Sequence, residues 1–370
     1  MATNRATFFP VGNGDTTLIE VDGKTIQTDI NYRDNAENEE QPEYDFAPDL
    51  QDACYKGSRN YRLSLFVLTH PDKDHLGGFA RIFYCGEPTK YGDRSKNDDK
   101  LILVEEMWVS SYASDPNYKT DISESVFDEI ERRITLQGTE DGEQNGNRIR
   151  VLDTEADVTS GNFSAGIVWK LLAPTPEEAV IEEGDGEENQ PSSNDSSLVI
   201  RWTVTVDGGK NHLLLGGDAT VEVWDRIWDD HKKQTSELSW HVLLAPHHCS
   251  RGAMARKNAD DEYEYSDNAL DALGQVEGDG FVVSSSKEIK RNDDNPPSWE
   301  AKQKYLDILR GANAKNADAR FLNPDTHKNG DPDPVVFDFT KTGPSLKVAG
   351  TGGSKAASLG AGATISPTYG

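Results

Sequence analysis

The stretch Leu63–Gly78, which decides the fold, reads Leu-Ser-Leu-Phe-Val-Leu-Thr-His-Pro-Asp-Lys-Asp-His-Leu-Gly-Gly. Its apolar run stops at His70, and two imidazoles and two carboxylates follow at once, on His70, Asp72, Asp74 and His75. Pro71 cannot donate to a sheet ladder, so the strand must end there. The pattern predicts a buried strand that leads into a metal-binding loop. The alternative is an ordinary surface turn, because Pro, Asp, Lys and Gly are also common turn residues.

The order of the polar residues in this loop bears on the number of metal ions. His70, Asp72 and Asp74 alternate along the chain, whereas Asp74 and His75 are adjacent and must diverge. One loop can therefore supply ligands to two neighbouring ions, an arrangement used in metal-assisted hydrolysis.

Composition limits the classes of partner. The 370 residues carry a formal net charge of −27, which repels nucleic acid and anionic membrane and argues against a general DNA-coating role. Any polyanionic substrate would need a local basic patch. Three cysteines without paired spacing suggest a reducing compartment, and no apolar run is long enough for a signal peptide or a membrane span. We therefore expect a soluble, cytoplasmic protein that does not bind membranes.

The spacing His70-x-Asp72-x-Asp74-His75 resembles the metal loop of the metallo-β-lactamase superfamily, whose usual form is His-x-His-x-Asp-His. The Asp in the second position, with the trailing Leu76-Gly77-Gly78, is closer to the metallo-hydrolase domain of the bacterial competence DNA-uptake channel. The resemblance implies an α/β fold of the αββα type. Two mixed sheets would lie face to face, with helices on the outer faces and the metals at one rim.

Two segments near the N-terminus match the same subgroup. Val11-Gly12-Asn13-Gly14-Asp15 resembles its glycine turn, with Asn13 in place of the usual Gln, and Gln27-Thr28-Asp29 resembles the strand that follows. The resemblance implies that Asp29 supports a metal ligand. The alternative for Asp29 is a strand-end turn.

A later strand, within His212–Leu215, ends in Gly216-Gly217-Asp218. The resemblance implies that Asp218 bridges two metal ions. The alternative is an N-cap for the helix predicted over 221–228. Before this strand, Asn194–Val199 resembles the corresponding segment of the same subgroup. Most other branches of the superfamily have a metal-binding His in this segment, and this chain lacks it. The resemblance therefore puts full occupancy of one metal site in question.

A second apolar strand, within 241–245, ends at Pro246 and delivers His247, His248 and Cys249. We expect one imidazole, preferentially His248, to bind metal. His247 would then support it or donate to the transition state, although the sequence leaves the reverse assignment open. Cys249 fits a buried thiol better than a soft metal ligand.

Ser286, Lys287, Lys290 and Arg291 form the best local cluster for binding a phosphate. The alternative is a solvated loop at the entry to a helix. Asn295 follows where the subgroup usually has a His.

The domain organisation expected from these matches is one domain over residues 1–349. Acidic loop insertions are expected at about 32–60, 88–100, 175–193 and 254–278, and a flexible tail rich in Gly, Ala and Ser over 350–370. A helix is expected to run from 74 to 84, another over 121–136, and a third from about 298 to 309.

These motifs together predict a hydrolase in which one or two ions, Zn²⁺ or Mn²⁺, activate water. We expect His70 and Asp72 to hold one ion, Asp74, His75 and His248 the other, and Asp218 to lie between them. Asp74, His247 and Lys287 would act in catalysis.

The substrate and partners are expected from the resemblance. The subgroup suggests a phosphodiester in DNA, RNA or a nucleotide, and it suggests a role in antiphage defence with a protein partner from a multi-gene system. The alternatives are a hydrolase of small esters, lactones or thioesters, and a metal-stabilised binding module without catalysis. The sequence does not determine the oligomeric state.

Overall fold

The computed structural model describes residues 3–33, 36, 43–57, 60–93, 100–115, 124–179, 192–291, 295–312 and 315–347. The expected tail at 350–370 lies outside these residues, as does most of the acidic loop expected at 175–193. Among the helices within the described ranges, none combines the length and the apolar character that a membrane crossing requires.

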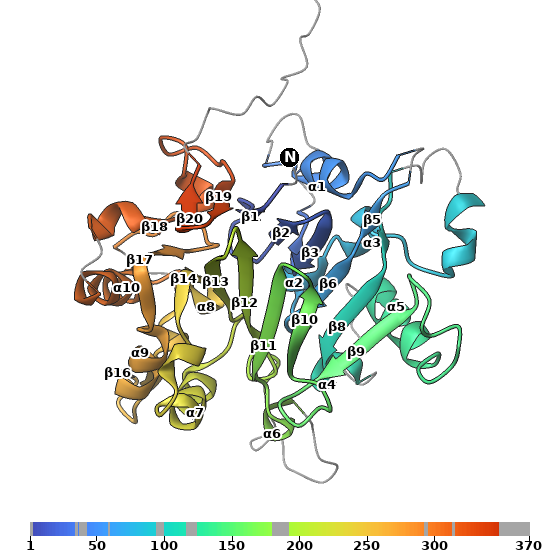
Figure 1. Cartoon of the computed structure of the whole chain (residues 1–370). Coiled ribbons are helices and arrows are strands. Elements are labelled where there is room, and N and C mark those ends of the chain that lie inside the picture. The colour runs from blue at the N-terminus through green and yellow to red at the C-terminus, as the bar shows by residue number, and fades with distance from the viewer. Residues whose placement is uncertain are drawn as a thin grey trace, which may run out of the picture.

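Two mixed β-sheets form the centre of the molecule (Figure 1). The larger sheet has the order β20 (Gly343–Leu346), β19 (Val335–Thr340), β1 (Arg5–Phe8), β2 (Thr17–Val21), β3 (Lys24–Thr28), β6 (Leu65–Leu68), β8 (Glu106–Ser110) and β9 (Arg148–Leu152). The smaller sheet has the order β10 (Ser160–Ser164), β11 (Ile167–Ala173), β12 (Val199–Val206), β13 (Gly209–Leu215), β14 (Trp240–Leu244), β17 (Val276–Val283) and β18 (Phe321–Leu322).

Each sheet has a parallel part and an antiparallel part. In the larger sheet the strands from β3 to β9 pair in parallel, and in the smaller sheet those from β13 to β18 do so. Parallel strands covered on both faces are apolar throughout, and β6, with the sequence Leu-Phe-Val-Leu, is entirely buried. The expectation of two mixed sheets is therefore confirmed.

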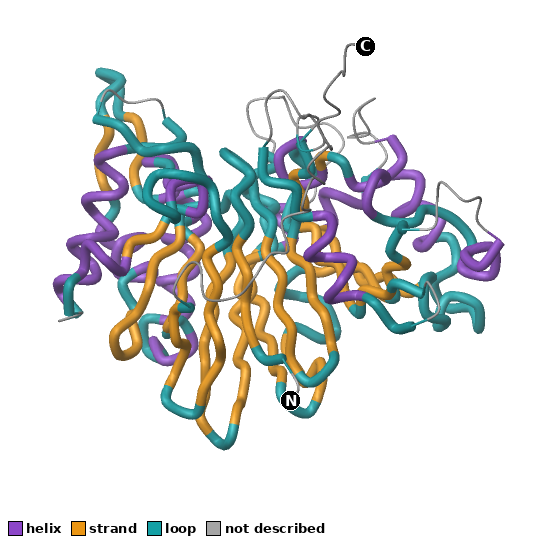
Figure 2. Tube along the Cα trace, turned by 90° about the horizontal axis from the view of Figure 1, so that it is seen from above, coloured by secondary structure: helices purple, strands orange, loops and turns teal. Residues whose placement is uncertain are grey.

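The longer helices lie on the two outer flanks of the strand layers, as seen from above in Figure 2. They are α1 (Ala47–Cys54), α5 (Glu124–Ile134), α7 (Val221–His231), α9 (Asp267–Leu273) and α10 (Trp299–Gly311). The short helical turns are α2 (Lys73–Leu76), α3 (Phe79–Ile82), α4 (Ser111–Ser114), α6 (Pro176–Ala179) and α8 (Pro246–Cys249).

The buried apolar residues form three layers that match this order. One layer lies between the two sheets and includes Ile19, Trp202 and Phe337. A second packs α1, α3 and α5 on the larger sheet, and a third packs α7, α9 and α10 on the smaller one. The observed arrangement is thus helix, sheet, sheet, helix, as the sequence predicted.

The segment after the metal loop differs from the expected single helix over 74–84. It forms two separate turns, α2 and α3, divided by Gly77 and Gly78. Gly78 has φ of +75°, and a Cβ there would lie 2.5 Å from the carbonyl oxygen of Tyr32. The chain therefore turns where a larger residue would clash, because glycine alone tolerates both the conformation and the close approach.

Two other segments differ from the prediction: an expected loop insertion contains strands and a helix, and an expected helix ends earlier. Residues 254–278, expected as an acidic insertion, include the paired strands β15 (Ala255–Lys257) and β16 (Tyr263–Tyr265), followed by α9. The helix expected over 121–136 is α5, which spans Glu124–Ile134 among the described residues. The many charged residues of this segment gave no hydrophobic pattern from which the pairing of β15 with β16 could be predicted.

Candidate metal centre

The metal loop leaves the carboxyl end of β6 and delivers His70 and His75 to the rim between the two sheets. Both imidazoles are fully buried, and their ring centroids are 4.0 Å apart. His75 Nε2 lies 3.1 Å from Asp218 Oδ1, and His70 Nε2 lies 3.9 Å from Asp218 Oδ2. The strand end and the loop thus direct two Nε2 atoms toward one carboxylate.

Asp29 fixes the orientation of this loop from the end of β3. Its carboxylate accepts hydrogen bonds from the backbone N–H of Thr69 at 2.7 Å and from the Thr69 hydroxyl at 2.6 Å. It also lies 2.8 Å from His75 Nδ1. A proton on Nδ1 leaves Nε2 as the atom available to a metal, which is the usual arrangement of a metal-binding His and its supporting carboxylate.

Asp218 follows β13 on a turn that its glycine neighbour makes possible. Gly217 has φ of +50°, and a Cβ on it would lie 2.7 Å from Thr69 Oγ1. The backbone N–H of Asp218 donates to Ser197 Oγ at 3.1 Å. The N-cap of α7 is Thr220, so the alternative interpretation of Asp218 as that cap is wrong.

The third contribution comes from the turn after β14. His247, His248 and Cys249 have φ of 50°, 51° and 67°, a left-handed conformation that costs roughly 1–3 kcal/mol for each non-glycine residue. Strain of this kind persists where the surroundings impose it, often at functional sites. The turn buries His248 and leaves the His247 side chain 24% exposed.

His248 lies at the centre of the cluster. Its Nε2 is 3.3 Å from His75 Nε2, 3.3 Å from Asp74 Oδ2 and 3.4 Å from Asp218 Oδ2. Its Nδ1 is 3.1 Å from the carbonyl oxygen of Ser285, which can accept a proton from it, and the backbone N–H of Gly14 lies at the same 3.1 Å and donates when Nδ1 is bare. With the proton on Nδ1, Nε2 is the bare nitrogen and is directed at the other ligand candidates.

The remaining residues of the predicted set lie around Asp218. Asp72 Oδ2 is 3.7 Å from His70 Nε2, and His247 Nε2 is 3.6 Å from Asp218 Oδ2. The structure thus brings together His70, Asp72, Asp74, His75, Asp218, His247 and His248. Which of these atoms bind metal stays a prediction.

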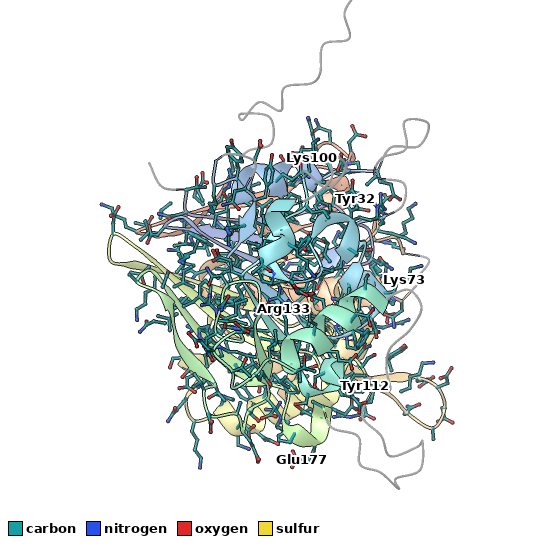
Figure 3. All side chains as sticks on the ribbon, turned by 90° about the vertical axis from the view of Figure 1, so that its right-hand side faces the viewer. Tyr32, Lys73, Lys100, Tyr112, Arg133 and Glu177 are labelled. Atoms are coloured by element: carbon teal, nitrogen blue, oxygen red, sulfur yellow. The ribbon has the colours of Figure 1, made fainter. Side chains whose placement is uncertain are left out.

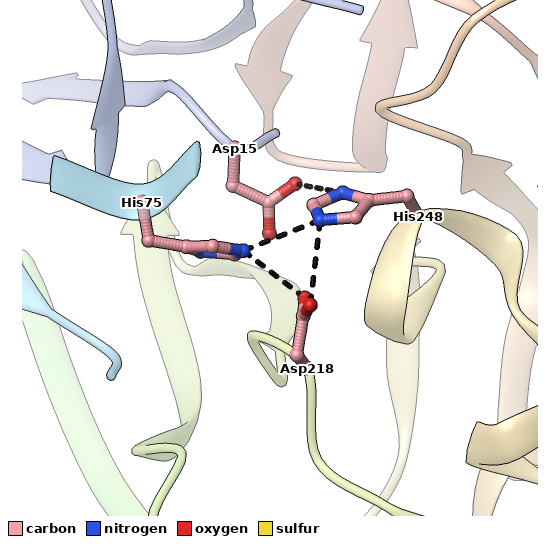
Figure 4. Close-up of side chains that lie close together, drawn as sticks. All are labelled: Asp15, His75, Asp218 and His248. Carbon is pink, nitrogen blue, oxygen red and sulfur yellow. Dashed lines mark hydrogen bonds and ion pairs between the residues drawn. The ribbon is translucent and has the colours of Figure 1, made fainter. Parts of the chain in front are cut away.

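Asp15 is a member of the cluster to which the sequence assigned no role. Its carboxylate is buried, and Oδ1 is 3.5 Å from His248 Nδ1 (Figure 4). Asp15, His75, Asp218 and His248 each place a ligand atom within 4.8 Å of the others. The available signal was the glycine turn Val11–Asp15, which matched the subgroup but was interpreted only as a marker of the fold.

The buried charges of the cluster act strongly on one another. Burial would lower the pKa of His75, but Asp218 and Asp29 outweigh it and raise that pKa well above its usual value. His248 behaves in the same way through Asp218, Asp15 and Asp74. Burial would raise the pKa of Asp218, yet His248 and His75 lower it well below the usual value.

Three polar atoms of the cluster are buried without a well-formed hydrogen bond: His70 Nε2, Asp15 Oδ1 and Asp218 Oδ1. Asp218 Oδ1 still contacts His75 Nε2 at 3.1 Å, and Asp15 Oδ1 lies 3.5 Å from His248 Nδ1, so His70 Nε2 is the atom with the poorest compensation. Unpaired buried polar atoms are costly, and a divalent cation satisfies imidazole nitrogen and carboxylate oxygen together. The donor set therefore fits a divalent cation. Imidazole favours Zn²⁺, and the number of carboxylates also suits Mn²⁺.

The expected phosphate cluster is arranged differently from the prediction. Lys290 pairs with Glu288 at 3.1 Å, and the Arg291 guanidinium lies 4.9 Å from the centre of the Trp299 ring. Lys287 is exposed, and its backbone N–H donates to Asn13 Oδ1 at 3.0 Å. The catalytic role expected for Lys287 stays a prediction.

Asn295 and Cys249 have structural contacts. Asn295 Oδ1 accepts hydrogen bonds from the Ser250 hydroxyl and from the backbone N–H of Arg251, so it holds the chain just after His248. Cys249 points into the helix-covered core, where burial raises the pKa of its thiol to about 12. The expectation of a small buried thiol is confirmed.

A second histidine group lies at the opposite ends of β13 and β14. It consists of His212, His241 and Glu277, whose candidate ligand atoms also lie within 4.8 Å of one another. His212 Nε2 is 3.4 Å from Glu277 Oε2.

No protein-family model and no curated protein matches this chain. Among solved structures, it is similar to a metallo hydrolase from the hyperthermophilic archaeon Ignicoccus hospitalis, with 14% identity, a TM-score of 0.39 and coverage of 91% of this chain and 100% of the other. A diphosphatase from the PhnP family has 11% identity, a TM-score of 0.37 and coverage of 90% and 98%. A subclass B3 metallo-β-lactamase from a soil metagenome library has 12% identity, a TM-score of 0.30 and coverage of 66% and 77%.

These likenesses are distant, and they carry no argument about activity. The fold rests on the order of the strands, and the metal centre rests on its own geometry. The nearer resemblance to the domain of the DNA-uptake channel stays a prediction. What the molecule itself presents is a buried His and Asp cluster, suited to a divalent cation, at the rim of an αββα sandwich.

Proposed function

We propose that this protein is a metal-dependent phosphodiesterase. One observation carries the proposal: the glycine turn before β2 and three strand-end loops direct carboxylates and imidazoles to a single buried point, where His70 Nε2 has no hydrogen-bond partner. A bound divalent cation would acidify water and polarise a phosphoryl oxygen. Two such ions about 4 Å apart are typical of phosphatases and nucleases.

The grouping of side chains around Asp218 supports places for two ions. His70 and Asp72 form one group beside Asp218. His70 Nε2 lies 3.9 Å from Asp218 Oδ2, and Asp72 Oδ2 lies 3.7 Å from the same His70 nitrogen. Asp74 and His248 form the other pair, at 3.3 Å. Asp218, with both oxygens directed at imidazoles, is suited to bridge the two groups.

His247 is the candidate for proton transfer. It is the more exposed imidazole of the pair, and its Nε2 lies 3.6 Å from Asp218. Burial lowers the pKa of His247, although Asp218 opposes this. A neutral imidazole at neutral pH can accept a proton from the nucleophile or hold a hydrogen bond to the leaving group.

The test is hydrolysis of bis-p-nitrophenyl phosphate by metal-stripped protein, with Mn²⁺ or Zn²⁺ added back. We expect turnover that depends on metal, is lost in Asp74→Ala and is retained in Glu277→Gln, a carboxylate removed from the second histidine group. Hydrolysis of p-nitrophenyl acetate alone would instead establish the small-ester reading, which the net charge of −27 favours. Bound metal without turnover of either compound would establish the binding module.

A further inference from the structure

The histidine turn, which consists of His247, His248 and Cys249, is strained and has to be held in place by other parts of the chain. Its three residues have φ of 50°, 51° and 67°. Residues other than glycine keep such a conformation only where their surroundings impose it. The turn also delivers His248 Nε2 to within 3.4 Å of Asp218 Oδ2. The residues that impose the turn therefore control the position of a candidate ligand.

The chain just before α10 holds the end of this turn with three hydrogen bonds. Asn295 Oδ1 accepts one from the Ser250 hydroxyl at 3.1 Å and one from the backbone N–H of Arg251 at 2.9 Å. The backbone N–H of Ser298 donates the third to the carbonyl oxygen of Cys249 at 2.9 Å. Two of the three bonds depend on one side-chain oxygen, so Asn295 is the residue on which the end of the turn depends most.

The amide of Asn295 is anchored on its other side by the hairpin of β15 and β16. Its Nδ2 donates to the Tyr263 hydroxyl at 3.1 Å, and Tyr263 lies in β16. The Arg251 guanidinium lies 4.2 Å from the centre of the Tyr263 ring and pairs with Glu300 of α10 at 2.9 Å. In Figure 1, β16 lies beside α9 on the flank of the smaller sheet. A backbone N–H can donate only to the amide oxygen, so these contacts also fix which way the amide points.

The same segment contacts the glycine turn on the other side of His248. Asn13 Nδ2 donates to the carbonyl oxygen of Pro296 at 3.1 Å. Its neighbour Gly14 donates its backbone N–H to His248 Nδ1 at 3.1 Å, and Asp15 follows directly. The chain before α10 therefore joins the two turns that carry His248 and Asp15.

The metal loop is held by different residues. Asp29 fixes it through Thr69 and His75. Within the described ranges, no hydrogen bond of the Asn295 side chain reaches this loop. Figure 3, which views the molecule from the side away from the hairpin, labels Lys73 of the loop. A change at Asn295 should therefore move the histidine turn and leave the metal loop in place.

We infer that Asn295 is a positioning residue of the metal centre. It fixes the histidine turn so that His248 already faces the other candidate ligands before a cation binds. The inference rests on the metal centre of the proposed function, and it adds a residue that is not itself a candidate ligand. A preformed site binds more tightly, because less order has to be gained on binding. Tyr263 has a smaller share, since it holds one of the three hydrogen bonds of the amide.

The first test needs neither metal nor turnover. The protein is labelled isotopically at histidine and freed of metal, and the imidazole resonances of the wild type and of Asn295→Ala are compared by NMR. We expect the resonances of His247 and His248 to shift and those of His70 and His75 to stay. Single His→Gln variants assign each resonance. Unshifted His247 and His248 resonances in the folded variant would overturn the inference.

The matched control is Asn211→Ala, at the end of β13 that lies away from Asp218. The Asn211 amide also has three hydrogen bonds: Nδ2 donates to the carbonyl oxygens of Val204 at 3.2 Å and Thr340 at 3.0 Å, and Oδ1 accepts from the Thr340 backbone N–H at 3.3 Å. We expect thermal stability to fall in this variant while the resonances of the histidine turn stay. An equal shift in the control would make Asn295 a general contributor to stability and overturn the inference.

Metal affinity gives the second test, with rescue by a conservative change. Asn295→Asp keeps one oxygen for Ser250 and Arg251 and offers the other to the Tyr263 hydroxyl. By isothermal titration calorimetry, we expect Asn295→Ala to bind Zn²⁺ about tenfold more weakly, at the low end of the range typical of supporting residues. Tyr263→Phe should lose less, and Asn295→Asp should stay near the wild type. Equal losses in the alanine and aspartate variants would overturn the inference.

The two tests separate this inference from the proposed function. Equal binding of Zn²⁺ by the wild type and by Asn295→Ala would reject the positioning role and leave the metal-dependent enzyme. Wild-type protein that binds no cation, but whose His247 and His248 resonances shift in Asn295→Ala, would reject the proposed function alone.

Discussion

The same two strands carry a histidine and acid cluster at each end, and the two clusters differ in chemistry. At the carboxyl ends of β13 and β14 lie Asp218 and His248, and at the amino-terminal side of the same strands lie His212 and His241. Both clusters bring candidate ligand atoms within 4.8 Å. Residue type and proximity are therefore equal, and other features must decide which cluster takes a cation.

The hydrogen bonds of the ring nitrogens are the first difference. At the metal centre, Nδ1 of His75 faces a carboxylate, and Nδ1 of His248 faces the Ser285 carbonyl as well as the backbone N–H of Gly14. A proton on either Nδ1 therefore has an acceptor, and in that state Nε2 is bare. At the other end, the backbone N–H of His212 donates to Nδ1 of His241 at 3.1 Å. A neutral His241 must then carry its proton on Nε2, the nitrogen that faces Glu277, and it cannot offer that atom to a metal.

The surrounding charge is the second difference. Carboxylates dominate the metal centre and raise the pKa values of His75 and His248. At His212, burial first, and then Arg201 and His241, lower the pKa to about 3. A site that disfavours a proton on imidazole through nearby cations also disfavours a metal ion. The comparison teaches that ligand spacing alone does not identify a metal site.

The largest effect is expected from removing the bridge. Asp218→Asn keeps the size of the side chain but removes the charge between the two groups of ligands. We expect turnover of bis-p-nitrophenyl phosphate to fall by at least about 1,000-fold, more than the 10- to 100-fold typical of supporting residues. Circular dichroism should show an unchanged fold. Activity within tenfold of the wild type would remove Asp218 from the centre.

Measuring the bound metal tests whether only the cluster around Asp218 binds a cation. His248→Gln should lower the affinity for Zn²⁺ or Mn²⁺ by at least about 100-fold, since a ligand is lost from an otherwise intact site. His241→Gln is the matched change at the other end of the sheet and should leave the stoichiometry unaltered. Metal analysis after equilibrium dialysis gives both values. A loss of bound metal in His241→Gln would show that the second cluster also binds a cation.

A smaller effect is expected from the support of His75. Asp29→Asn removes the charge that holds the proton on Nδ1 and leaves the two contacts with Thr69 weakened. We expect metal affinity to fall by about 10- to 100-fold and excess metal to restore turnover. Isothermal titration calorimetry measures the affinity. Failure of excess metal to rescue activity would mean that Asp29 acts on the fold instead.

The second cluster has the smallest expected effect on activity, and its prediction concerns pH. Arg201, Lys210, His241 and Glu277 surround His212, whose lowered pKa means that the unfolded chain takes up the proton first as pH falls below about 6.5. The part of the free energy of unfolding that neutral His212 contributes at pH 7 is therefore lost as the pH falls from about 6.5 toward 3.

His212→Gln should flatten this part of the stability curve. We expect the wild type to lose about 2–3 kcal/mol more than the variant between pH 7 and pH 4.5, because each of the two pH units below about 6.5 contributes about 1.4 kcal/mol. Urea unfolding at the two pH values gives the free energy of unfolding. An equal change in both proteins would show that His212 does not titrate differently in the folded state.

Much of the centre was predictable because its ligands follow apolar strands. The run before His70 and the run before His247 indicate where each strand ends, and Gly217 indicates the turn at Asp218. These are local signals with a direct physical cause, namely the requirement to end a ladder or to adopt a left-handed turn. The outer helices were also predictable where apolar residues recur at helical spacing, as in α5 and α10.

The break between α2 and α3 was not predictable in the same way. Gly77 and Gly78 follow the metal-loop motif directly, but the residue that Gly78 approaches, Tyr32, comes from a segment far away in the sequence. The basic cluster at residues 286–291 stays a predicted phosphate site. Lys290 pairs with its neighbour Glu288, and the Arg291 guanidinium lies over the Trp299 ring, a contact that only the folded chain provides.

The sequence by itself determined where the strands end and which loops carry the His and Asp residues, since strand period, Pro and Gly act within a few residues of one another, and the sandwich followed from the family resemblance of those loops. The tertiary structure alone decided that Asp15 joins the centre, that Gly14 approaches a residue 234 positions away, and that Asn295 contacts the chain just after the histidine turn. It also decided which donors and acceptors face each histidine nitrogen. These features depend on the register between sheets and on individual hydrogen bonds, which no local pattern of residues encodes.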